Sequence, residues 1–221
     1  MSTLSMKRDE IHAIIPVNVV KLSKQRLSTM LNSADRTHLS TAMLCDVVDA
    51  VKSVRLISHV TIVSADRKVR KIARSHKVHF LWEGTRRGLN KGVRLAVADS
   101  ERRGATSALI IHSDIPFADS REISRFLTRC QSYSVGMVPS RDGSGTNVLF
   151  LKPPNVMKPL FGRQSYQKHR NEAEERGLSF KVVRSKALGF DVDEPNDLRR
   201  LLRHRVSGDT GKLLRNLRKH V

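Results

Sequence analysis

Three aspartates stand where a nucleotidyl-transfer site needs carboxylates. Asp114 directly follows the apolar run 108–111, and Asp191 and Asp193 lie two residues apart in a segment with an extended pattern. Residues two apart in a strand share one face of the sheet. Carboxylates that converge there can hold a hard divalent cation, which prefers oxygen ligands and usually binds with phosphates. The pattern predicts a Mg²⁺ site of Asp114, Asp191 and Asp193 facing a nucleoside triphosphate.

Two cations follow the first predicted strand. Lys24 and Arg26 lie in the loop 18–28, where they could hold the β- and γ-phosphates that leave as pyrophosphate. An acceptor phosphate is already an anionic nucleophile, so its attack on the α-phosphorus needs no general base. The site must instead relieve the repulsion between the two phosphorylated substrates. This repulsion is roughly 4 kcal/mol for two unit charges about 4 Å apart at an effective dielectric constant of about 20. We expect Lys24, Arg26 and the metal ion to supply that relief.

A second anion site is predicted at the start of a later helix. Ser165 begins this helix three residues after Gly162, and free N–H groups at a helix N-terminus bind anions. His169, one turn further along, either faces the same anion or lies at the surface. Asn90 begins another predicted helix and either contacts the base or ribose of a nucleotide or simply starts the helix.

Each of these residues also has a simpler interpretation. Asp114 could be a turn residue before Pro116, and Asp193 could cap a helix that starts at 194–195. Ser165 could be a plain N-cap, and Lys24 and Arg26 could be solvated charges in a basic protein. The metal interpretation is favoured because three carboxylates are expected at one crevice.

Composition sets the class of protein. The chain has 221 residues, a net charge of +20, and 5% aromatic residues. The charge permits nucleic-acid binding, but basic residues are spread over helix faces and few aromatics are available for base stacking, so we expect no nucleic acid as partner. No apolar run reaches the ~20 residues of a membrane span, and the first ten residues have no apolar signal region, so a cytoplasmic location is expected.

Apolar runs alternate with helical periodicity along the chain, which is typical of an α/β fold, a three-layer αβα sandwich with a mostly parallel mixed sheet. We expect residues 1–206 to form a single nucleotidyltransferase domain and residues 207–221 a basic tail that could be helical, dock on a partner or membrane, or fray. Strands are expected at 11–17, 60–63, 78–82, 107–112, 134–139, 147–151, 180–184 and 188–192, and helices at 39–54 after an N-cap at Ser33, 68–74, 89–101, 121–130, 164–177 and 197–204. Ligands of such sheets bind beyond the carboxyl ends of the strands, so the motifs above can share one crevice.

Several motifs occur in the order found in one family. They are Ile14-Ile15-Pro16-Val17, Lys24-Gln25-Arg26-Leu27-Ser28, Leu89-Asn90, Asp114-Ile115-Pro116, Asp142-Gly143-Ser144-Gly145-Thr146-Asn147, the run from Phe161 to His169, and the run from Asp191 to Leu198. Over residues 11–198 the chain resembles the 2-phospho-L-lactate guanylyltransferases of coenzyme F-420 biosynthesis, a family that includes phosphoenolpyruvate guanylyltransferases.

The resemblance implies a Rossmann-like fold similar to nucleotide-diphospho-sugar transferases, and transfer from GTP to a phosphorylated three-carbon acid with release of pyrophosphate. It implies that Asp114, Asp191 and Asp193 bind Mg²⁺, with Lys24, Arg26 and Asp114 as catalytic residues. The implied nucleotide-binding residues are Pro16, Val17, Lys24, Arg26, Asn90 and Asp114, and the implied acceptor-binding residues are Thr146, Asn147, Gly162 and Ser165.

The chain departs from the family pattern at two positions. Asn18 replaces a common Lys, which puts one phosphate contact in doubt, and Ser144 interrupts the glycines before Thr146. The rival enzymes are molybdenum-cofactor guanylyltransferases and sugar-phosphate nucleotidyltransferases of similar fold. Their glycine-rich loop after the first strand is missing, because residues 18–28 contain no glycine. A nucleic-acid-binding protein is the alternative of another class.

The sequence leaves the acceptor open among 2-phospho-L-lactate, phosphoenolpyruvate and 3-phospho-D-glycerate. The choice of guanine rests on the resemblance alone. GTP and a small phospho-acid are the expected partners, and a homodimer is a further expectation.

Overall fold

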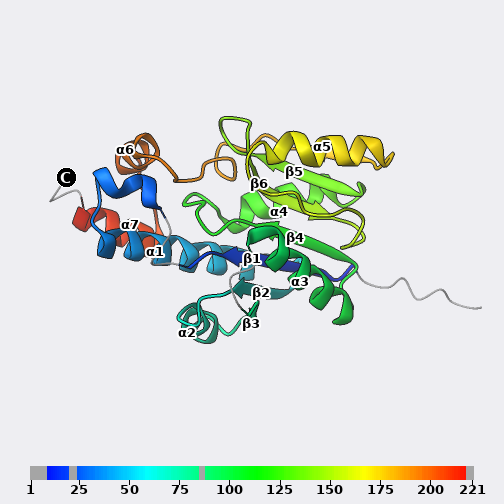
Figure 1. The fold of residues 1–221 in the computed structure, drawn as a ribbon, viewed down its shortest axis with the longest axis horizontal. Helices are drawn as coiled ribbons and strands as arrows, with labels where there is room; N and C mark the ends of the chain where they lie inside the picture. Colours follow the sequence, from blue (N-terminus) through cyan, green and yellow to red (C-terminus); the bar gives the residue numbers. More distant parts are fainter. Residues whose placement is uncertain (1–8, 20–23, 85–87, 218–221) are drawn as a thin grey trace, which may run out of the picture.

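The computed structural model describes residues 9–19, 24–84 and 88–217. Within these residues seven strands form one sheet in the order β3-β2-β1-β4-β6-β5-β7, and helices cover both of its faces (Figure 1). The strands are Ile11–Val17 (β1), Ile57–Ser64 (β2), His79–Trp82 (β3), Ser107–Ile111 (β4), Val135–Pro139 (β5), Thr146–Leu151 (β6) and Phe180–Val182 (β7). The helices are Ser33–Lys52 (α1), Val69–Ser75 (α2), Leu89–Arg102 (α3), Ser120–Cys130 (α4), Ser165–Glu175 (α5), Pro195–Arg203 (α6) and Gly208–Leu217 (α7), with a 3₁₀ helix at Gln25–Thr29 (η2).

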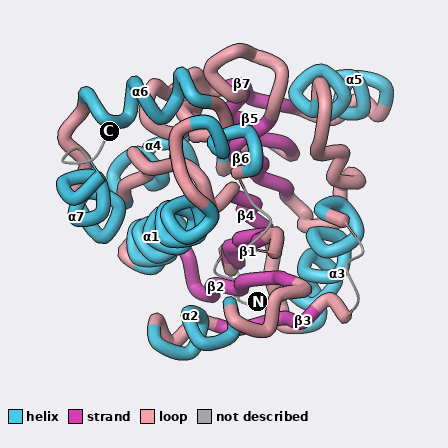
Figure 2. Tube along the Cα trace, turned by 60° about the vertical axis from the view of Figure 1, so that its left-hand side comes forward, coloured by secondary structure: helices cyan, strands magenta, loops and turns pink. Residues whose placement is uncertain are grey.

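The predicted α/β architecture is confirmed. Strands β3, β2, β1 and β4 are parallel, β6 runs antiparallel to both β4 and β5, and β7 is parallel to β5. Helices α1, α2, α4, α6 and α7 lie on one side of the sheet and α3 and α5 on the other (Figure 2). All seven residues of β1 are buried, because a central parallel strand is covered on both faces. This explains why β1 has an uninterrupted apolar pattern except at His12.

The predicted strand at 188–192 is wrong. Its apolar side chains are buried as expected, but the segment pairs with no strand. The sheet ends at β3 and β7, and the segment adds to neither of these edge strands. The segment instead crosses the end of the sheet, where the Val192 N–H donates to the Asp114 carbonyl at 3.2 Å.

The loop predicted at 18–28 contains a helix that the sequence pattern did not show. Residues 25–29 form η2, which buries Leu27 against Leu39 and Met43 of α1. The N-cap of α1 is Asn32, whose side chain accepts from the Asp35 N–H at 2.9 Å, so the prediction of Ser33 was off by one residue. Residues 20–23 of this loop lie outside the described residues.

Most of the basic tail packs on the domain. Helix α7 buries Leu214 and Leu217 in the same cluster as α1 and α6, beside α1 in Figure 1. The Asp46 carboxylate of α1 accepts from the Asp209 and Thr210 N–H groups at 2.7 and 2.8 Å, which satisfies the free donors at the start of α7. Residues 218–221 lie outside the described residues.

No helix in the described part of the chain is both long enough and apolar enough to cross a membrane. Trp82 is 48% exposed at the end of β3. The Arg67 guanidinium lies 4.6 Å from the centroid of its ring.

Candidate functional site

The topology explains why motifs far apart in the sequence meet. Parallel strands β1 and β4 end at one edge of the sheet, and antiparallel β6 begins at that same edge. The His112 N–H donates to the Asn147 carbonyl at 3.1 Å, which joins the end of β4 to the start of β6. Residues 190–193 return over this edge through the contact of Val192 with Asp114. The aspartates and the Thr146 motif therefore face one space.

A cavity of about 630 Å³ lies at this edge. It is lined by Arg26, Leu89, His112, Asp114, Ser140, Arg141, Asp142, Ser144, Gly145, Thr146, Asn147, Gly162, Arg163, Ser165, Asp191, Asp193, Glu194 and Asp197. The lining includes eight of the predicted site residues, namely Arg26, Asp114, Thr146, Asn147, Gly162, Ser165, Asp191 and Asp193. The structure thus brings the predicted metal ligands and the predicted acceptor site together.

Four predicted residues do not line the cavity. Pro16 and Val17 are within β1, paired with Val63 and Ser64 of β2. The Asn90 amide is used to hold the backbone of Phe161: its Nδ2 donates to the carbonyl at 2.9 Å and its Oδ1 accepts from the N–H at 2.7 Å. The nucleotide contacts of Pro16, Val17 and Asn90 stay predictions. The fourth predicted residue that does not line the cavity is Lys24.

Lys24 lies between two of the aspartates. Its Nζ is 2.5 Å from Asp114 Oδ2 and 2.7 Å from Asp193 Oδ1, and its side chain is only 6% exposed. Burial disfavours the charged amine, but the two carboxylates outweigh it and raise the pKa of Lys24. Burial likewise opposes the charge of Asp114, yet Lys24 and His112 lower the pKa of this carboxyl. Lys24 is therefore a charged group of the site rather than a solvated surface residue.

The N-cap of α6 is Glu194, so Asp193 does not have the capping role that was the simpler interpretation. The Asp197 carboxylate accepts from the Asp193 and Glu194 N–H groups at 3.2 and 2.9 Å. The Arg26 guanidinium contacts Glu194 at 3.1 Å, with both side chains exposed. Asp193 is thus held by its backbone, and its carboxylate is available to a cation.

The aspartates suit a divalent cation by their donor chemistry. Asp114 Oδ1 is buried and has no hydrogen-bond partner among the described residues. Burial, followed by repulsion from Asp114 and Asp193, raises the pKa of Asp191 to about 6, which shows a carboxyl short of compensating positive charge. No group of three or more metal-binding side chains in the described residues has the arrangement of a formed metal site, and the Lys24 ammonium supplies the positive charge between Asp114 and Asp193.

Asn147 is buried and connects two parts of the site. Its Nδ2 donates to the Leu188 carbonyl at 3.1 Å and to Asp191 Oδ1 at 3.3 Å. This contact lowers the pKa of Asp191 but does not offset its burial. Asn147 thus orients a carboxylate, in addition to lining the cavity where an acceptor was predicted to bind.

Thr146, Ser165 and His169 form a buried network, and Thr146 and Ser165 also line the cavity. The Thr146 N–H donates to Ser165 Oγ at 2.9 Å, and Thr146 Oγ1 lies 3.0 Å from His169 Nδ1. Gln164, not Ser165, is the N-cap of α5, so the simple capping role of Ser165 is wrong. His169 is 0% exposed, which excludes the surface position considered for it. Gly162 precedes Ser165 with φ of 119°, a backbone conformation that favours glycine.

Sequence reasoning missed part of the cavity wall. Ser140, Arg141 and Asp142 come from the turn between β5 and β6, and Arg141 Nη2 contacts Asp197 Oδ1 at 2.8 Å. Asp142 accepts from the Ser144 N–H at 3.1 Å and from Ser144 Oγ at 2.7 Å, so Ser144, which interrupts the glycines before Thr146, helps to fix the turn. The only sequence signal for this wall was the Asp-Gly turn at 142–143.

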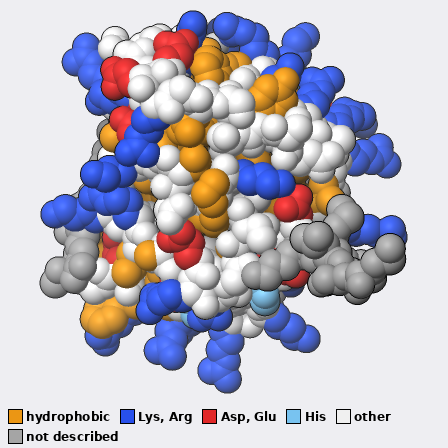
Figure 3. All heavy atoms as spheres, turned by 90° about the vertical axis from the view of Figure 1, so that its right-hand side faces the viewer, with side chains coloured by type: hydrophobic (Ala, Val, Ile, Leu, Met, Phe, Trp, Pro, Cys, Tyr) orange, Lys and Arg blue, Asp and Glu red, His pale blue; other side chains and the backbone are white. Residues whose placement is uncertain are grey.

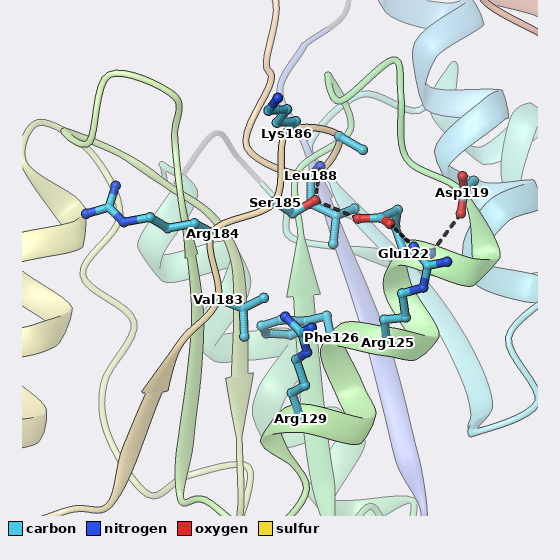
Figure 4. A pocket seen from close by; sticks show the side chains of 11 residues that line it. Asp119, Glu122, Arg125, Phe126, Arg129, Val183, Arg184, Ser185, Lys186 and Leu188 are labelled. Atoms are coloured by element: carbon cyan, nitrogen blue, oxygen red, sulfur yellow. Dashed lines mark hydrogen bonds and ion pairs between the residues drawn. The ribbon is translucent and has the colours of Figure 1, made fainter.

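A second cavity of about 470 Å³ lies between α4 and the segment after β7 (Figure 4). Its lining includes Arg125, Arg129, Arg184 and Lys186, but Arg184 points away from α4 in Figure 4 and these cations do not converge. Glu122 accepts from Ser185 Oγ at 2.7 Å and from the Arg125 guanidinium at 2.6 Å, so these polar groups satisfy one another. None of the predicted site residues lines this second cavity, whereas eight of them line the cavity of about 630 Å³.

Comparison with known proteins identifies the family. Residues 11–221 match the family described as guanylyl transferase CofC like. The chain belongs to this family. A phosphoenolpyruvate guanylyltransferase of Sphaerobacter thermophilus is 34% identical over 89% of this chain and 94% of its own length. A 2-phospho-L-lactate guanylyltransferase of Methanothermobacter thermautotrophicus is 35% identical over 93% of this chain and 90% of its own length. The resemblance inferred from the ordered motifs is confirmed, and the protein is a nucleotidyltransferase.

Solved structures confirm the fold of this guanylyltransferase family member. A putative nucleotide-diphospho-sugar transferase from Desulfovibrio desulfuricans G20 is similar with a TM-score of 0.78, at 19% identity over 96% of this chain and 98% of that one. A nucleotidyl transferase from Methanothermobacter thermautotrophicus has a TM-score of 0.68, at 13% identity over 94% of this chain and 99% of that one. At such identities the likeness concerns the fold alone.

Proposed function

We propose that the protein transfers the guanylyl group of GTP to the phosphate of a small three-carbon acid and releases pyrophosphate. The observation that carries this proposal is one cavity lined by three aspartates, two of which contact Lys24, and by the buried residues Thr146 and Ser165. The aspartates suit a metal ion and a triphosphate, and the hydroxyls of Thr146 and Ser165 suit an acceptor anion. The family and the names of the relatives support guanine and a phospho-acid as the two substrates.

The mechanism we propose is direct displacement at the α-phosphorus. A phosphate oxygen of the acceptor forms the new P–O bond while the bond to the β-phosphate oxygen breaks, so pyrophosphate leaves with its electron pair and no base is needed. Asp114, Asp191 and Asp193 would hold Mg²⁺, which neutralises charge on the phosphates when bound. Lys24 and Arg26 contribute positive charge on the same side, where the β- and γ-phosphates are expected.

The first experiment pairs every nucleotide with every acid. The purified protein with Mg²⁺ is given GTP, ATP, CTP or UTP together with phosphoenolpyruvate, 2-phospho-L-lactate or 3-phospho-D-glycerate. Pyrophosphate release is followed and the adduct is identified by mass. We expect adduct with GTP and predominantly one acid, and no product when Mg²⁺ is removed by a chelator.

Asp114→Asn is the variant that tests the site. It keeps the size of the side chain but removes a charge that Lys24 and the metal need, so we expect kcat/KM to fall by at least about a hundred-fold. Glu175→Gln, on the exposed end of α5, is the matched control and should keep wild-type activity. Activity in Asp114→Asn equal to that of the control would contradict the proposed role of the aspartates.

The alternative of a nucleic-acid-binding protein is less well supported. On the face shown in Figure 3, Lys and Arg side chains lie around the whole outline, separated by hydrophobic and acidic side chains. A basic protein of this kind would bind RNA or DNA with a steep salt dependence that survives Asp114→Asn. Such binding without any nucleotidyl adduct would overturn the proposed function.

A further inference from the structure

The buried network of Thr146, Ser165 and His169 has a defined direction of hydrogen-bond donation. The Leu160 N–H donates to His169 Nε2 at 2.8 Å, and a backbone N–H can only be a donor. Nε2 must therefore carry no proton. His169 is 0% exposed, and burial lowers its pKa to about 4, so the ring is neutral near pH 7. A neutral ring with a bare Nε2 carries its proton on Nδ1.

This tautomer determines what the Thr146 hydroxyl does. Nδ1–H of His169 lies 3.0 Å from Thr146 Oγ1 and must donate to it. The Thr146 hydroxyl hydrogen cannot point back to the ring, because both would then offer a hydrogen along one line. No group among the described residues accepts this hydrogen, and Thr146 lines the cavity. Its hydroxyl is thus left as a donor toward the cavity.

Ser165 is constrained in the same sense. Its Oγ accepts from the Thr146 N–H at 2.9 Å, so its own hydrogen is also directed elsewhere. Ser165 lines the cavity, and no acceptor for this hydrogen is found among the described residues. Both hydroxyls are buried, at 2% exposure each, so water competes poorly for them. The hydroxyl groups of Thr146 and Ser165 together offer two hydrogen-bond donors to a ligand. The matching ligand atom is an oxygen that only accepts hydrogen bonds.

We propose that His169 is a positioning residue that commits the Thr146 hydroxyl to donate, so that Thr146 and Ser165 form a paired donor site for a fully ionised phosphate or carboxylate oxygen of the acceptor. This inference rests on the proposed function for the identity of the acceptor. His169 itself touches no substrate, since its two ring nitrogens are occupied by Thr146 and Leu160. A protonated oxygen is disfavoured there, because its own hydrogen would face the two donated hydrogens. An esterified oxygen is disfavoured because it carries no negative charge.

The tautomer can be measured without any activity. In the ¹⁵N-labelled protein, long-range proton–nitrogen correlation spectra separate a ring nitrogen that carries a proton from one that does not. We expect His169 to show a protonated Nδ1 and a bare Nε2, assigned by comparison with His169→Gln. A His169 ring with the proton on Nε2, or with both nitrogens protonated near pH 7, overturns the inference.

Two variants of His169 distinguish its role as a hydrogen-bond donor to Thr146 from a merely structural role. His169→Asn places an amide N–H near the position of Nδ1 and loses the acceptor for Leu160, whereas His169→Gln places an amide near Nε2 and loses the donor to Thr146. Each removes one hydrogen bond, so a purely structural role predicts similar effects. We expect the Kd of phosphoenolpyruvate or 2-phospho-L-lactate to rise roughly ten-fold in His169→Gln and much less in His169→Asn.

Binding is measured by calorimetry with Mg²⁺ and guanosine 5′-(α,β-methylene)triphosphate, whose α–β bridge cannot be cleaved, so turnover is not required. The affinity for this nucleotide should be the same in both variants. Equal loss of acid binding in the two variants, or no binding of either acid by the wild-type protein, overturns the inference. Normal acid binding with the expected difference but no adduct from GTP would instead contradict the proposed function alone.

Discussion

At the scale of single residues, we expect Lys24 to have two roles, depending on whether a metal ion and phosphates occupy the site. Without a metal ion its ammonium compensates Asp114 and Asp193, as the distances of 2.5 and 2.7 Å show. Breaking a buried ion pair by removing one partner costs roughly 3–5 kcal/mol, since the remaining charge is left uncompensated. Lys24 is thus expected to stabilise the free protein as well as to bind the leaving phosphates.

Lys24→Met tests both roles. We expect a lower thermal midpoint than wild type in the presence of a chelator, and a larger rise of that midpoint on adding Mg²⁺, because the metal ion then supplies the missing charge. The kcat/KM for GTP should fall by roughly a hundred-fold or more. Lys71→Met, an exposed change on α2, is the control for loss of one positive charge. An Mg²⁺-induced shift no larger in Lys24→Met than in Lys71→Met would contradict this account.

Single residues also show how far the sequence could lead. The convergence of Asp114, Asp191 and Asp193 on one cavity could be predicted, because they lie in or just after buried apolar segments. The ion pairs of Lys24 could not, because they join residues 90 and 169 positions apart through a loop that has no periodic pattern. Asn90 was predicted near the nucleotide, but its amide is committed to Phe161, a contact that only tertiary structure reveals.

At the scale of elements, amphipathic pattern predicted nearly all helices and strands, with ends displaced by a few residues. It failed for residues 188–192, because alternating apolar residues indicate burial and do not show whether a segment pairs with a strand. It also missed η2, a short helix whose only buried side chain is Leu27. Both errors lie next to the site, where chain segments are held by single contacts rather than by repeated backbone pairing.

Helix α7 provides a prediction at this scale, because it was a candidate for a frayed end. Leu214 is 1% exposed and packs in the cluster that includes Leu39 and Met43 of α1. Leu214→Ala should lower the free energy of unfolding by roughly 2–5 kcal/mol, measured by urea titration. Leu213→Ala, at a partly buried neighbouring position, should cost clearly less. Equal and negligible effects of the two changes would show that α7 does not pack on the domain in solution.

At the scale of the whole molecule, buried histidines make the stability of the protein depend on pH. Burial lowers the pKa of His12, of His112 and, to about 4, of His169. Below about pH 6.5 the unfolded chain binds protons at these positions that the folded chain does not, for His169 down to about pH 4, so the free energy of unfolding falls as the pH falls. Asp191 acts in the opposite sense, since its raised pKa of about 6 lets the folded state bind a proton first.

Comparison with His169→Gln isolates one of these opposing contributions. A pKa that drops from 6.5 to about 4 corresponds to roughly 3 kcal/mol of stability that is present above pH 6.5 and lost as the pH falls to 4. Urea titrations at pH 7.5 and pH 4.5 should therefore show a decrease for wild type that exceeds the decrease for His169→Gln by up to this amount. The variant is less stable than wild type at pH 7.5, because its donor to Thr146 is lost, so the two stability curves converge toward acid. Parallel curves would mean that His169 has the same pKa in the folded and unfolded chains. That result would contradict the buried ring that accepts from the Leu160 N–H.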